Sequence, residues 1–287
     1  MNKIKSILIT GGTGSFGQAF VRFLLDSTDV QRICVYSRGE HAQAALRDAI
    51  SDDPRVRYMV GDVRDLRRLT RACRGVDTVI HAAALKRIET GAYNPEEMVK
   101  TNVLGTMNVI DAAIASGVFR VVGLSSDKAF EPCSPYGQSK ALAESLMLAA
   151  NITHGIKFAC TRYGNIWNAQ GSVVPKWDKL VMHNKPITLT DPECTRFFMT
   201  IEEAVNMVWD LATTMHGGEL IIPQYLPAYR LGDLALAFQA VYSGEVPIIQ
   251  TGLPKFEKLH ESMNAELCSR DARRLTIGEL MGLVENV

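Results

Sequence analysis

Residues 6–17 read SILITGGTGSFG, a short apolar run that ends in spaced glycines. The run predicts a buried strand of a parallel sheet, and an amphipathic helical pattern follows from Ser15 to about Asp26. Glycines at positions 11, 14 and 17 permit a tight turn, close approach of the backbone to a pyrophosphate, and close helix–strand packing. The helix N-terminus adds N–H donors and a positive dipole. The stretch therefore predicts a dinucleotide site in preference to a purely structural glycine turn.

Outward from this unit, strand and helix patterns alternate as far as Gly164. Apolar runs predict strands at residues 33–37, 56–60, 77–84, 119–126 and 156–164, and helical patterns lie at 40–50, 66–73, 96–116 and 135–151. This alternation predicts the α/β class, with a Rossmann-type doubly wound parallel sheet.

After Gly164 the pattern changes. Helical patterns at residues 177–183, 201–214 and 231–241 alternate with short strand-like runs at 187–189, 219–222 and 246–249 and with proline-rich turns. We therefore expect a cofactor-binding domain over residues 1–165 and a smaller, mixed α/β substrate-binding lobe over residues 166–287, whose chain segments can interleave.

The composition is that of a globular protein without a strong charge bias. Of 287 residues, 47% are hydrophobic, and the 31 basic and 31 acidic residues cancel, which argues against nucleic-acid and anionic-membrane partners. The six cysteines lack metal-type spacing, so we expect no metal site and reduced thiols in a cytoplasmic protein. The N-terminal apolar run is too short for a signal peptide, and we find no run long enough to span a membrane.

The end of the second predicted strand bears on the choice of cofactor. An enzyme that uses NAD usually carries an acid there for the ribose hydroxyls, but this chain has Ser37 and Arg38. An arginine fits a 2′-phosphate, so we expect NADP rather than NAD; the alternative is a solvated surface arginine. Asp62 and Val63, after the third strand, are expected to flank the adenine, although Asp62 could instead cap the next turn.

Residues 124–140, LSSDKAFEPCSPYGQSK, concentrate titratable groups at a strand end. Tyr136 and Lys140 are four residues apart on a predicted helix and share one face. An ammonium beside a phenol favours the phenolate, so the pair predicts a tyrosine that acts as a base.

With these motifs the chain resembles the extended short-chain dehydrogenase/reductases. It is most similar to the NADP-dependent, inverting UDP-N-acetylglucosamine 4,6-dehydratases of the polysaccharide biosynthesis protein family. The resemblance covers residues 5–261. Its markers are His81-Ala-Ala-Ala-Leu-Lys86, Tyr93-Asn-Pro95, Lys100-Thr-Asn102, Ser126-Asp127-Lys128-Ala129, Tyr136-x-x-x-Lys140, Thr161-Arg-Tyr-Gly-Asn165, Gly171-Ser-Val-Val-Pro175, Thr195-Arg-Phe197 and Glu257-Lys-Leu-His-Glu261.

The resemblance implies a role for each matching residue. Tyr136 would take the O4 proton, with Ser126 on the same oxygen and Lys140 beside the phenol. Lys128 would be the C5 base, made partly neutral by burial and by Lys140, and Asp127 the acid for water loss. The implied cofactor-binding residues are Gly11, Thr13, Gly14, Ser15, Phe16, Gly17, Ser37, Arg38, Asp62, Val63, Ala82, Ala83, Ala84, Lys86, Asn102, Tyr136 and Lys140. The implied substrate-binding residues are Lys86, Asn165, Val173, Arg196, Lys255 and Glu257.

Two departures from the family pattern stand out. Pro254 and Phe256 replace an arginine and a glycine before the final His-Glu, which leaves Lys255 as the nearby cation. Cys133 lies in the loop between Asp127 and Tyr136, where no thiol is expected.

Three functions remain open from the sequence. A dehydratase uses all five catalytic candidates. A UDP-sugar 4-epimerase would need only Ser126, Tyr136 and Lys140, and a silent NADP-binding sensor or scaffold would need no Tyr–Lys pair. The resemblance also implies a UDP-sugar substrate and a homo-oligomer, a dimer through a four-helix interface of residues 96–116 and 135–151 or a larger assembly such as a hexamer.

Overall fold

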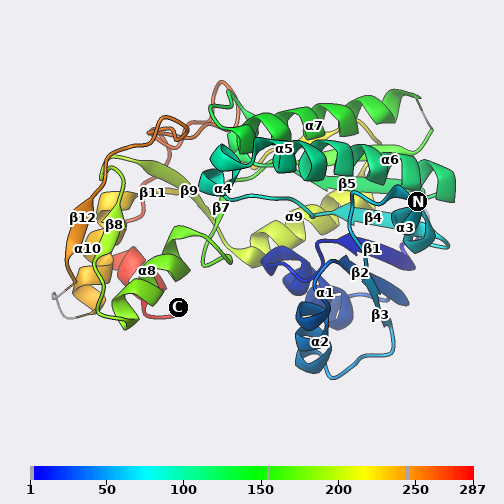
Figure 1. Cartoon of the computed structure of the whole chain (residues 1–287), viewed down its shortest axis with the longest axis horizontal. Helices are drawn as coiled ribbons and strands as arrows, with labels where there is room; N and C mark the ends of the chain where they lie inside the picture. The colour runs from blue at the N-terminus through cyan, green and yellow to red at the C-terminus, as the bar shows by residue number, and fades with distance from the viewer. Residues whose placement is uncertain (1–2, 154, 243–245) are drawn as a thin grey trace.

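The computed structural model describes residues 3–153, 155–242 and 246–287. Its centre is a seven-stranded sheet whose neighbouring strands all pair in parallel, in the order β10-β6-β5-β4-β1-β2-β3 (Figure 1). The strands are β1 (Ser6–Thr10), β2 (Arg32–Ser37), β3 (Val56–Val60), β4 (Thr78–His81), β5 (Arg120–Leu124), β6 (Lys157–Thr161) and β10 (Leu220–Ile221). The predicted Rossmann-type sheet is confirmed. Its order reverses between β1 and β4, where ligands bind in such folds.

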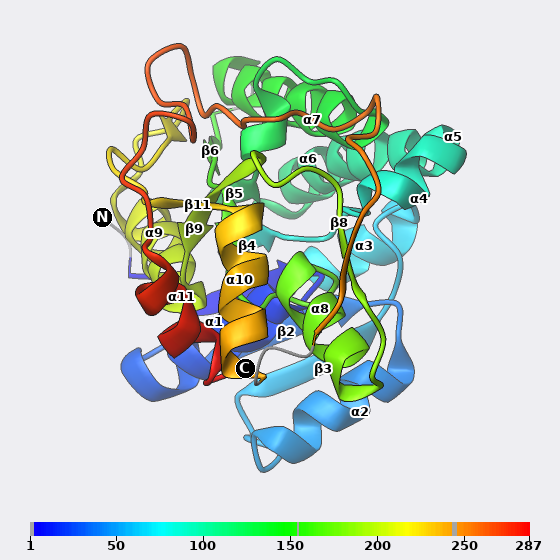
Figure 2. The same ribbon diagram turned by 90° about the vertical axis from the view of Figure 1, so that its left-hand side faces the viewer.

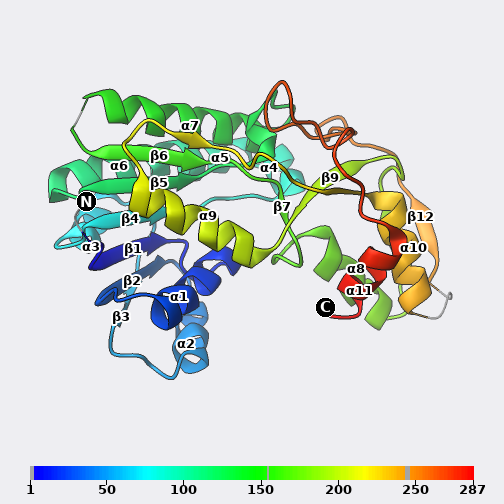
Figure 3. The ribbon, with the colours of Figure 1, turned by 180° about the vertical axis from the view of Figure 1, so that it is seen from behind.

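Helices cover both faces of this sheet because successive residues of each buried strand point to opposite sides. Ile7 and Ile9 pack into one apolar cluster and Leu8 into the other. The first cluster is covered by α1 (Ser15–Ser27), α2 (Glu40–Ala49) and α9 (Ile201–Thr214). The second is covered by α3 (Leu66–Cys73), α6 (Gly105–Ser116) and α7 (Pro135–Thr153). Figure 3 shows α9 and α1 on the same face of the sheet.

The long helix expected at residues 96–116 is interrupted. It consists of α5 (Pro95–Met98), a π-helix η1 (Val99–Leu104) and α6, and a short helix α4 (Ile88–Tyr93) precedes it. π-helical turns are rare and often occur at functional sites. Here the turn contains the buried Asn102.

A smaller lobe lies beside the carboxyl ends of the sheet strands (Figures 1 and 2). It contains α8 (Val173–Met182), α10 (Leu231–Val241) and α11 (Ile277–Val284) around a third apolar cluster. Its strands are β7 (Asn165–Ile166), β9 (Thr195–Met199) and β11 (Ala228–Arg230) in one sheet, and β8 (Ile187–Leu189) and β12 (Ile248–Gln250) in another. The segments interleave, since α9 and β10 follow the first lobe strands in sequence but pack on the main sheet.

The described helices include none that is both long and apolar enough to cross a bilayer.

Candidate active site

One cavity of about 1070 Å³ lies between the ends of the sheet strands and the smaller lobe. Ligand pockets usually measure roughly 300–1,000 Å³, so there is room for two ligands. The cavity is lined by every cofactor and substrate residue expected from the sequence except Asn102 and Lys255, and by every expected catalytic residue except Asp127.

The glycine-rich loop closes one end of the cavity. Gly11 has a positive φ of 68°, and a Cβ atom on it would lie 2.8 Å from the Ala83 nitrogen. A Cβ atom on Gly17 would lie 2.5 Å from the Gly12 Cα atom, so α1 can pack here only without a side chain. Gly14 is the N-cap of α1 and provides no side-chain cap, which leaves the first N–H groups for a ligand. These features fit the pyrophosphate of a dinucleotide.

The ends of β2 and β3 form the adjacent wall. Ser37 is buried, and its hydroxyl accepts a hydrogen bond from Gln43 (3.0 Å), whereas Arg38 is exposed at the cavity. The Asp62 carboxylate is held by two guanidinium nitrogens of Arg64, at 2.7 and 2.9 Å. The wall therefore presents the Arg38 cation and the Asp62 carboxylate, whose charge Arg64 already neutralises.

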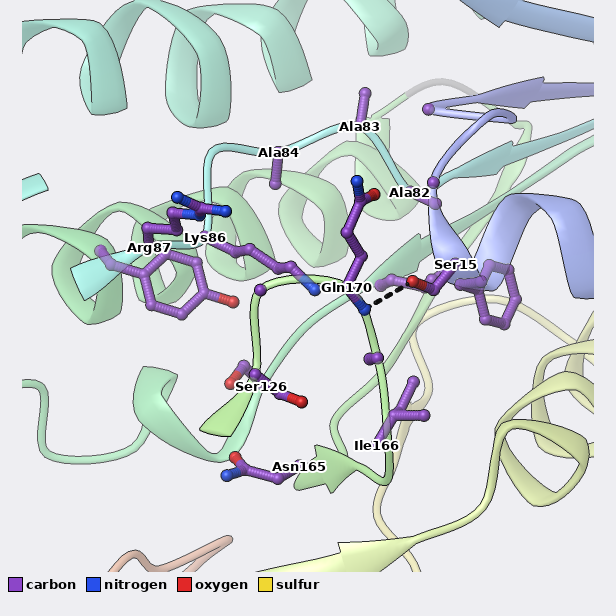
Figure 4. Close-up of a pocket in the computed structure, with 18 of the residues that line it drawn as sticks. Ser15, Ala82, Ala83, Ala84, Lys86, Arg87, Ser126, Asn165, Ile166 and Gln170 are labelled. Atoms are coloured by element: carbon purple, nitrogen blue, oxygen red, sulfur yellow. Dashed lines mark hydrogen bonds between the residues drawn. The ribbon is translucent and has the colours of Figure 1, made fainter. Parts of the chain in front are cut away.

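The chain after β4 forms the third side. Asn102 lies behind this chain, buried, rather than in the cavity. Its side chain accepts from the Leu85 nitrogen (2.8 Å) and donates to the Leu85 oxygen and to Ser139, both at 2.9 Å. Asn102 thus fixes the backbone next to Lys86 and ties it to α7. In Figure 4, Ala82–Ala84 and Ser15 lie on one side of the cavity and Ser126 and Asn165 on the other.

Ser126, Tyr136 and Lys140 all line the cavity beyond the end of β5. The pKa of Tyr136, however, is not shifted in the expected direction. Burial raises the pKa of Tyr136; the Lys128 ammonium and a hydrogen bond with Ser126 lower it by less. The Lys140 ammonium donates a hydrogen bond to the Leu124 carbonyl, and burial lowers the pKa of Lys140. The expected lowering of the phenol pKa by Lys140 is therefore not found, because the ring is desolvated and the cation that lowers the pKa of Tyr136 is Lys128.

Asp127 and Lys128 form the short 3₁₀ helix η2 (Asp127–Ala129), which the Ser126 hydroxyl caps by accepting from the Lys128 nitrogen. The two side chains contact each other: Lys128 Nζ lies 3.1 Å from Asp127 Oδ1, and Ser126 donates to the same oxygen at 2.8 Å. Asp127 Oδ2 is buried and has no hydrogen-bond partner within the described ranges. Asp127 is thus fixed beneath the cavity, and Lys128 reaches into it.

Glu261 is the residue that the sequence reasoning missed. It is 2% exposed, and its Oε1 atom lies 3.6 Å from Lys128 Nζ. Burial alone lowers the pKa of Lys128, but Asp127 and Glu261 raise it, and the net pKa is above its usual value. The expectation of a partly neutral Lys128 is wrong for this arrangement. The only signal in the sequence was that Glu261 ends the Glu257–Glu261 marker.

The lobe supplies the remaining wall. Asn165 accepts a hydrogen bond from Lys128 at 3.1 Å, and Val173 lines the cavity at the start of α8. Arg196 and Glu257 pair at 3.5 Å, and both line the cavity. Lys255 is exposed and lies outside the cavity lining.

A lobe loop also reaches the glycine-rich loop. The Gln170 nitrogen donates to the Ser15 hydroxyl at 2.9 Å, as Figure 4 shows. This contact joins the two parts of the protein across the cavity. Gln170 could not have been found from the sequence, because its partner is 155 residues away. Among the described residues there is no cluster of side chains suited to hold a metal ion.

Comparisons with known proteins agree with this geometry. Residues 7–277 match the model of a family described as polysaccharide biosynthesis protein. The chain is 43% identical over 263 residues to a UDP-N-acetylglucosamine 4,6-dehydratase (inverting) of Campylobacter jejuni, covering 90% of this chain and 77% of the relative. It is 39% identical over 265 residues to a UDP-glucose 4-epimerase of Rickettsia bellii, with the same coverage. The X-ray structure of Pen from Bacillus thuringiensis has a TM-score of 0.94 at 31% identity and covers 99% of this chain and 98% of its own.

Proposed function

The chain belongs to the polysaccharide biosynthesis protein family, and we propose that it is a nucleotide-sugar 4,6-dehydratase acting on UDP-N-acetylglucosamine. One observation carries this proposal. The residues suited to oxidation, Ser126 and Tyr136, share a cavity with Lys128, and Lys128 is paired directly with Asp127, which is buried beneath the cavity; this pair is suited to elimination. An oxidised C4 acidifies the neighbouring C5 proton, so both sets of groups are needed at one place.

We propose NADP as the cofactor. The glycine cradle and the uncapped α1 N-terminus suit a dinucleotide, and Arg38 beside the neutralised Asp62 suits a 2′-phosphate. When bound, the nicotinamide would take a hydride from C4 and return it at C6. Lys140 and Tyr136, which line the same cavity, would hold the nicotinamide end, and Asn102 would act through the backbone of Leu85.

The oxidation step rests on Tyr136 as base. Tyr136 acts as the phenolate, the form that the Lys128 charge and the Ser126 hydrogen bond favour; it takes the proton of the C4 hydroxyl, and Ser126 hydrogen-bonds the same oxygen. The hydrogen-bonded series Tyr136–Ser126–Asp127 gives that proton a path, because Ser126 donates to Asp127 at 2.8 Å. By this path the proton removed from O4 can return to the Asp127–Lys128 pair after the reduction at C6.

The elimination step rests on the Lys128–Asp127 contact. Transfer of one proton across this 3.1 Å contact converts ammonium and carboxylate into amine and carboxylic acid. The Lys128 amine then takes the C5 proton. The Asp127 acid, beneath the cavity, gives its proton to the Ser126 hydroxyl, which passes a proton to O6, and O6 leaves as water. After the reduction at C6, Lys128 returns its proton to C5. The O4 proton on Tyr136 then passes through Ser126 to Asp127 and across the 3.1 Å contact to the Lys128 amine, and every group is back in its starting state.

Substrate binding is assigned to the lobe side of the cavity. Arg196 and Lys86 supply the positive charge that a diphosphate requires, and Glu257 can accept from ribose hydroxyls. Asn165, already bonded to Lys128, would contact the sugar, with Val173 beside it and Lys255 at the exposed edge.

We further propose a homo-oligomer that pairs through η1, α6 and α7. Large apolar side chains on these helices are exposed, among them Val99, Leu104, Met107 and Leu142. Such a patch suits a helix-to-helix interface between two copies of the chain.

A UDP-sugar 4-epimerase is the second candidate, and the name of the Rickettsia bellii relative favours it. An epimerase returns the hydrogen to C4 and has no use for an acid and a base at C5 and C6. The buried Asp127–Lys128 pair would then have no chemical task.

The test is the reaction of the protein with UDP-N-acetylglucosamine and NADP⁺ in D₂O, followed by proton NMR. A dehydratase forms a 6-deoxy-4-keto sugar with a new methyl signal and deuterium at C5. Formation of the 4-epimer without a methyl signal would support the epimerase instead, and an unchanged substrate would refute both functions.

A further inference from the structure

The C-terminal segment of residues 256–261 lies against the loop that carries the acid/base pair. Lys258 Nζ donates to the Phe130 oxygen at 2.7 Å, and Cys133 Sγ lies 3.4 Å from the Phe256 oxygen. The segment is anchored on its other side by β9, where the Thr195 nitrogen donates to the Leu259 oxygen at 2.9 Å. Backbone more than 120 residues downstream in the sequence is therefore held at fixed distance from η2.

Glu261 ends this segment in a position that is determined by its backbone. Its nitrogen donates to the Ser269 hydroxyl (2.9 Å), and its oxygen accepts from the Ser269 nitrogen (2.8 Å). Its buried carboxylate is shared between two lysines, with Oε1 3.6 Å from Lys128 and Oε2 3.3 Å from Lys258. A carboxylate buried in this way costs free energy unless it is paired, so the contact constrains Lys128 as well as Glu261.

We propose that Glu261 is a positioning residue that holds Lys128 in its ammonium form and thereby sets how readily Lys128 gives up its proton. The proposal rests on the dehydratase function only in calling Lys128 the C5 base. Three oxygens from three separate segments surround the ammonium group: Asp127 Oδ1 and Asn165 Oδ1, each at 3.1 Å, and Glu261 Oε1 at 3.6 Å. Glu261 is the member that adds charge without belonging to η2.

The charges around Lys128 give the sign of the effect. Asp127 and Glu261 favour the ammonium and raise the pKa of Lys128, Tyr136 adds in the same direction, and Arg196 opposes it. Glu261 itself faces Lys128, Lys258, Arg196 and Cys133. Removing the Glu261 charge must therefore lower the pKa of Lys128, and removing the Lys258 charge must raise it.

This arrangement has a chemical purpose in the proposed reaction. Lys128 must keep the proton taken from C5 until the reduction at C6 is complete and then return it. An anion beside the ammonium stabilises that proton-bearing state. The same anion makes it harder for Lys128 to pass its ammonium proton to Asp127 at the start of elimination. Glu261 therefore makes Lys128 less readily deprotonated at the start and more stable as the ammonium after it has taken the C5 proton.

The test measures the free-amine fraction of Lys128 directly, without the enzymatic reaction. Trace labelling with acetic anhydride at about pH 8 proceeds in proportion to the neutral fraction, because this pH lies below the ordinary lysine pKa of about 10.4. The labelling rate of Lys128 is read by peptide mass spectrometry relative to the exposed Lys179 in the same molecule. An adjacent charge shifts a pKa by about one to three units, so Glu261→Gln should label Lys128 at least about tenfold faster.

Lys258→Met separates electrostatics from loosening of the segment. Both substitutions remove a contact of the segment, and loosening alone would speed labelling in both. The proposal instead requires slower labelling of Lys128 in Lys258→Met, by about three- to tenfold. Glu261→Asp, which keeps the charge, should stay within about threefold of the wild type and serves if Glu261→Gln does not fold.

Glu257→Gln is the matched control, since it removes a second carboxylate of the same segment that pairs with Arg196 rather than Lys128. It should leave Lys128 labelling close to wild type. Equal labelling in wild type, Glu261→Gln and Lys258→Met, or faster labelling in both variants, would overturn the proposal. Absence of C5 deuteration with UDP-N-acetylglucosamine, despite the expected labelling changes, would refute the dehydratase function and leave the role of Glu261 intact.

Discussion

Lys128 and Lys140 both line the cavity, and they differ in the partner that meets each ammonium group. Lys140, on α7, donates to the Leu124 carbonyl, and its pKa is lowered by burial. Lys128, on η2, is flanked by Asp127 and Glu261, and its pKa is raised although burial acts against this. Burial pushes both lysines toward the amine, so the partners decide the outcome.

The two regions also differ in how the chain builds them. The oxidation side, with Leu124, Ser126, Tyr136 and Lys140, comes from one strand end and the next helix. The elimination side takes Asp127 and Lys128 from the same turn but needs Asn165 and Glu261 from the lobe. The first region therefore forms with the main sheet, and the second is complete only when the C-terminal segment is in place.

The largest effect is expected from breaking the oxidation side with Tyr136→Phe. Loss of the general base should lower C4 oxidation by about 10²–10⁴-fold, and C5 exchange must fall with it, because only the ketone acidifies that proton. The absorbance of the reduced cofactor and C5 deuteration report the two steps. Tyr58→Phe, which removes a buried hydroxyl outside the cavity, is the control and should keep both signals. C5 exchange that survives in Tyr136→Phe would contradict the order of steps.

A smaller effect is expected at the cofactor end of the oxidation side. Arg38→Glu should lower the ratio of NADP to NAD affinity by at least about tenfold, because a carboxylate repels the 2′-phosphate and suits free ribose hydroxyls. Binding constants for both cofactors provide the measurement. Arg47→Glu makes the same charge change on α2 outside the cavity and should leave the ratio unchanged. An unaltered ratio in Arg38→Glu would show that Arg38 does not select the cofactor.

The smallest effect concerns the contribution of the buried His81 to the stability of the folded protein. Burial and Lys140 lower the pKa of His81 to about 3, and its ring nitrogens contact the Thr10 and Thr106 hydroxyls at 2.7 and 3.0 Å. The unfolded chain binds this proton below about pH 6.5 and the folded chain does not, so stability is lost as the pH falls from about 6.5 toward 3. Between pH 7 and 5 the contribution is about 2 kcal/mol.

Urea unfolding at pH 7 and pH 5 measures this contribution. His81→Gln should show a pH dependence about 2 kcal/mol smaller than the wild type. His183→Gln, at an exposed histidine, should retain the wild-type dependence. An equal pH dependence in wild type and His81→Gln would mean that His81 is not held neutral.

The sequence predicts what local spacing determines. The strand–glycine–helix unit at residues 6–17 and the Tyr136–Lys140 spacing each lie within one supersecondary unit, so their geometry follows from the helix and strand periods. Helices α9 and α10 are likewise found where their patterns predict them, at Ile201–Thr214 and Leu231–Val241.

What the sequence cannot predict depends on pairing over long distances. The strands β7, β9 and β11 are short and exist because they pair with one another, and the π-helix at Val99–Leu104 is hidden in a continuous helical pattern. Lys128 contacts Glu261, 133 positions downstream, in addition to its sequence neighbour Asp127, and no local pattern reports the Glu261 contact. The error in its expected pKa came from counting burial without the two carboxylates, Asp127, the larger contributor, and Glu261.

The most direct test of the separation between the two regions is Lys128→Met with UDP-N-acetylglucosamine and NADP⁺ in D₂O. Reduced cofactor should still form, because Ser126, Tyr136 and Lys140 remain in place, and loss of the Lys128 charge, which raises the pKa of Tyr136, should slow its formation by about tenfold. Deuterium at C5 should fall by at least about 100-fold, because its base is gone. Wild-type C5 deuteration in Lys128→Met, or loss of both signals together, would contradict the assignment of oxidation and elimination to different lysines.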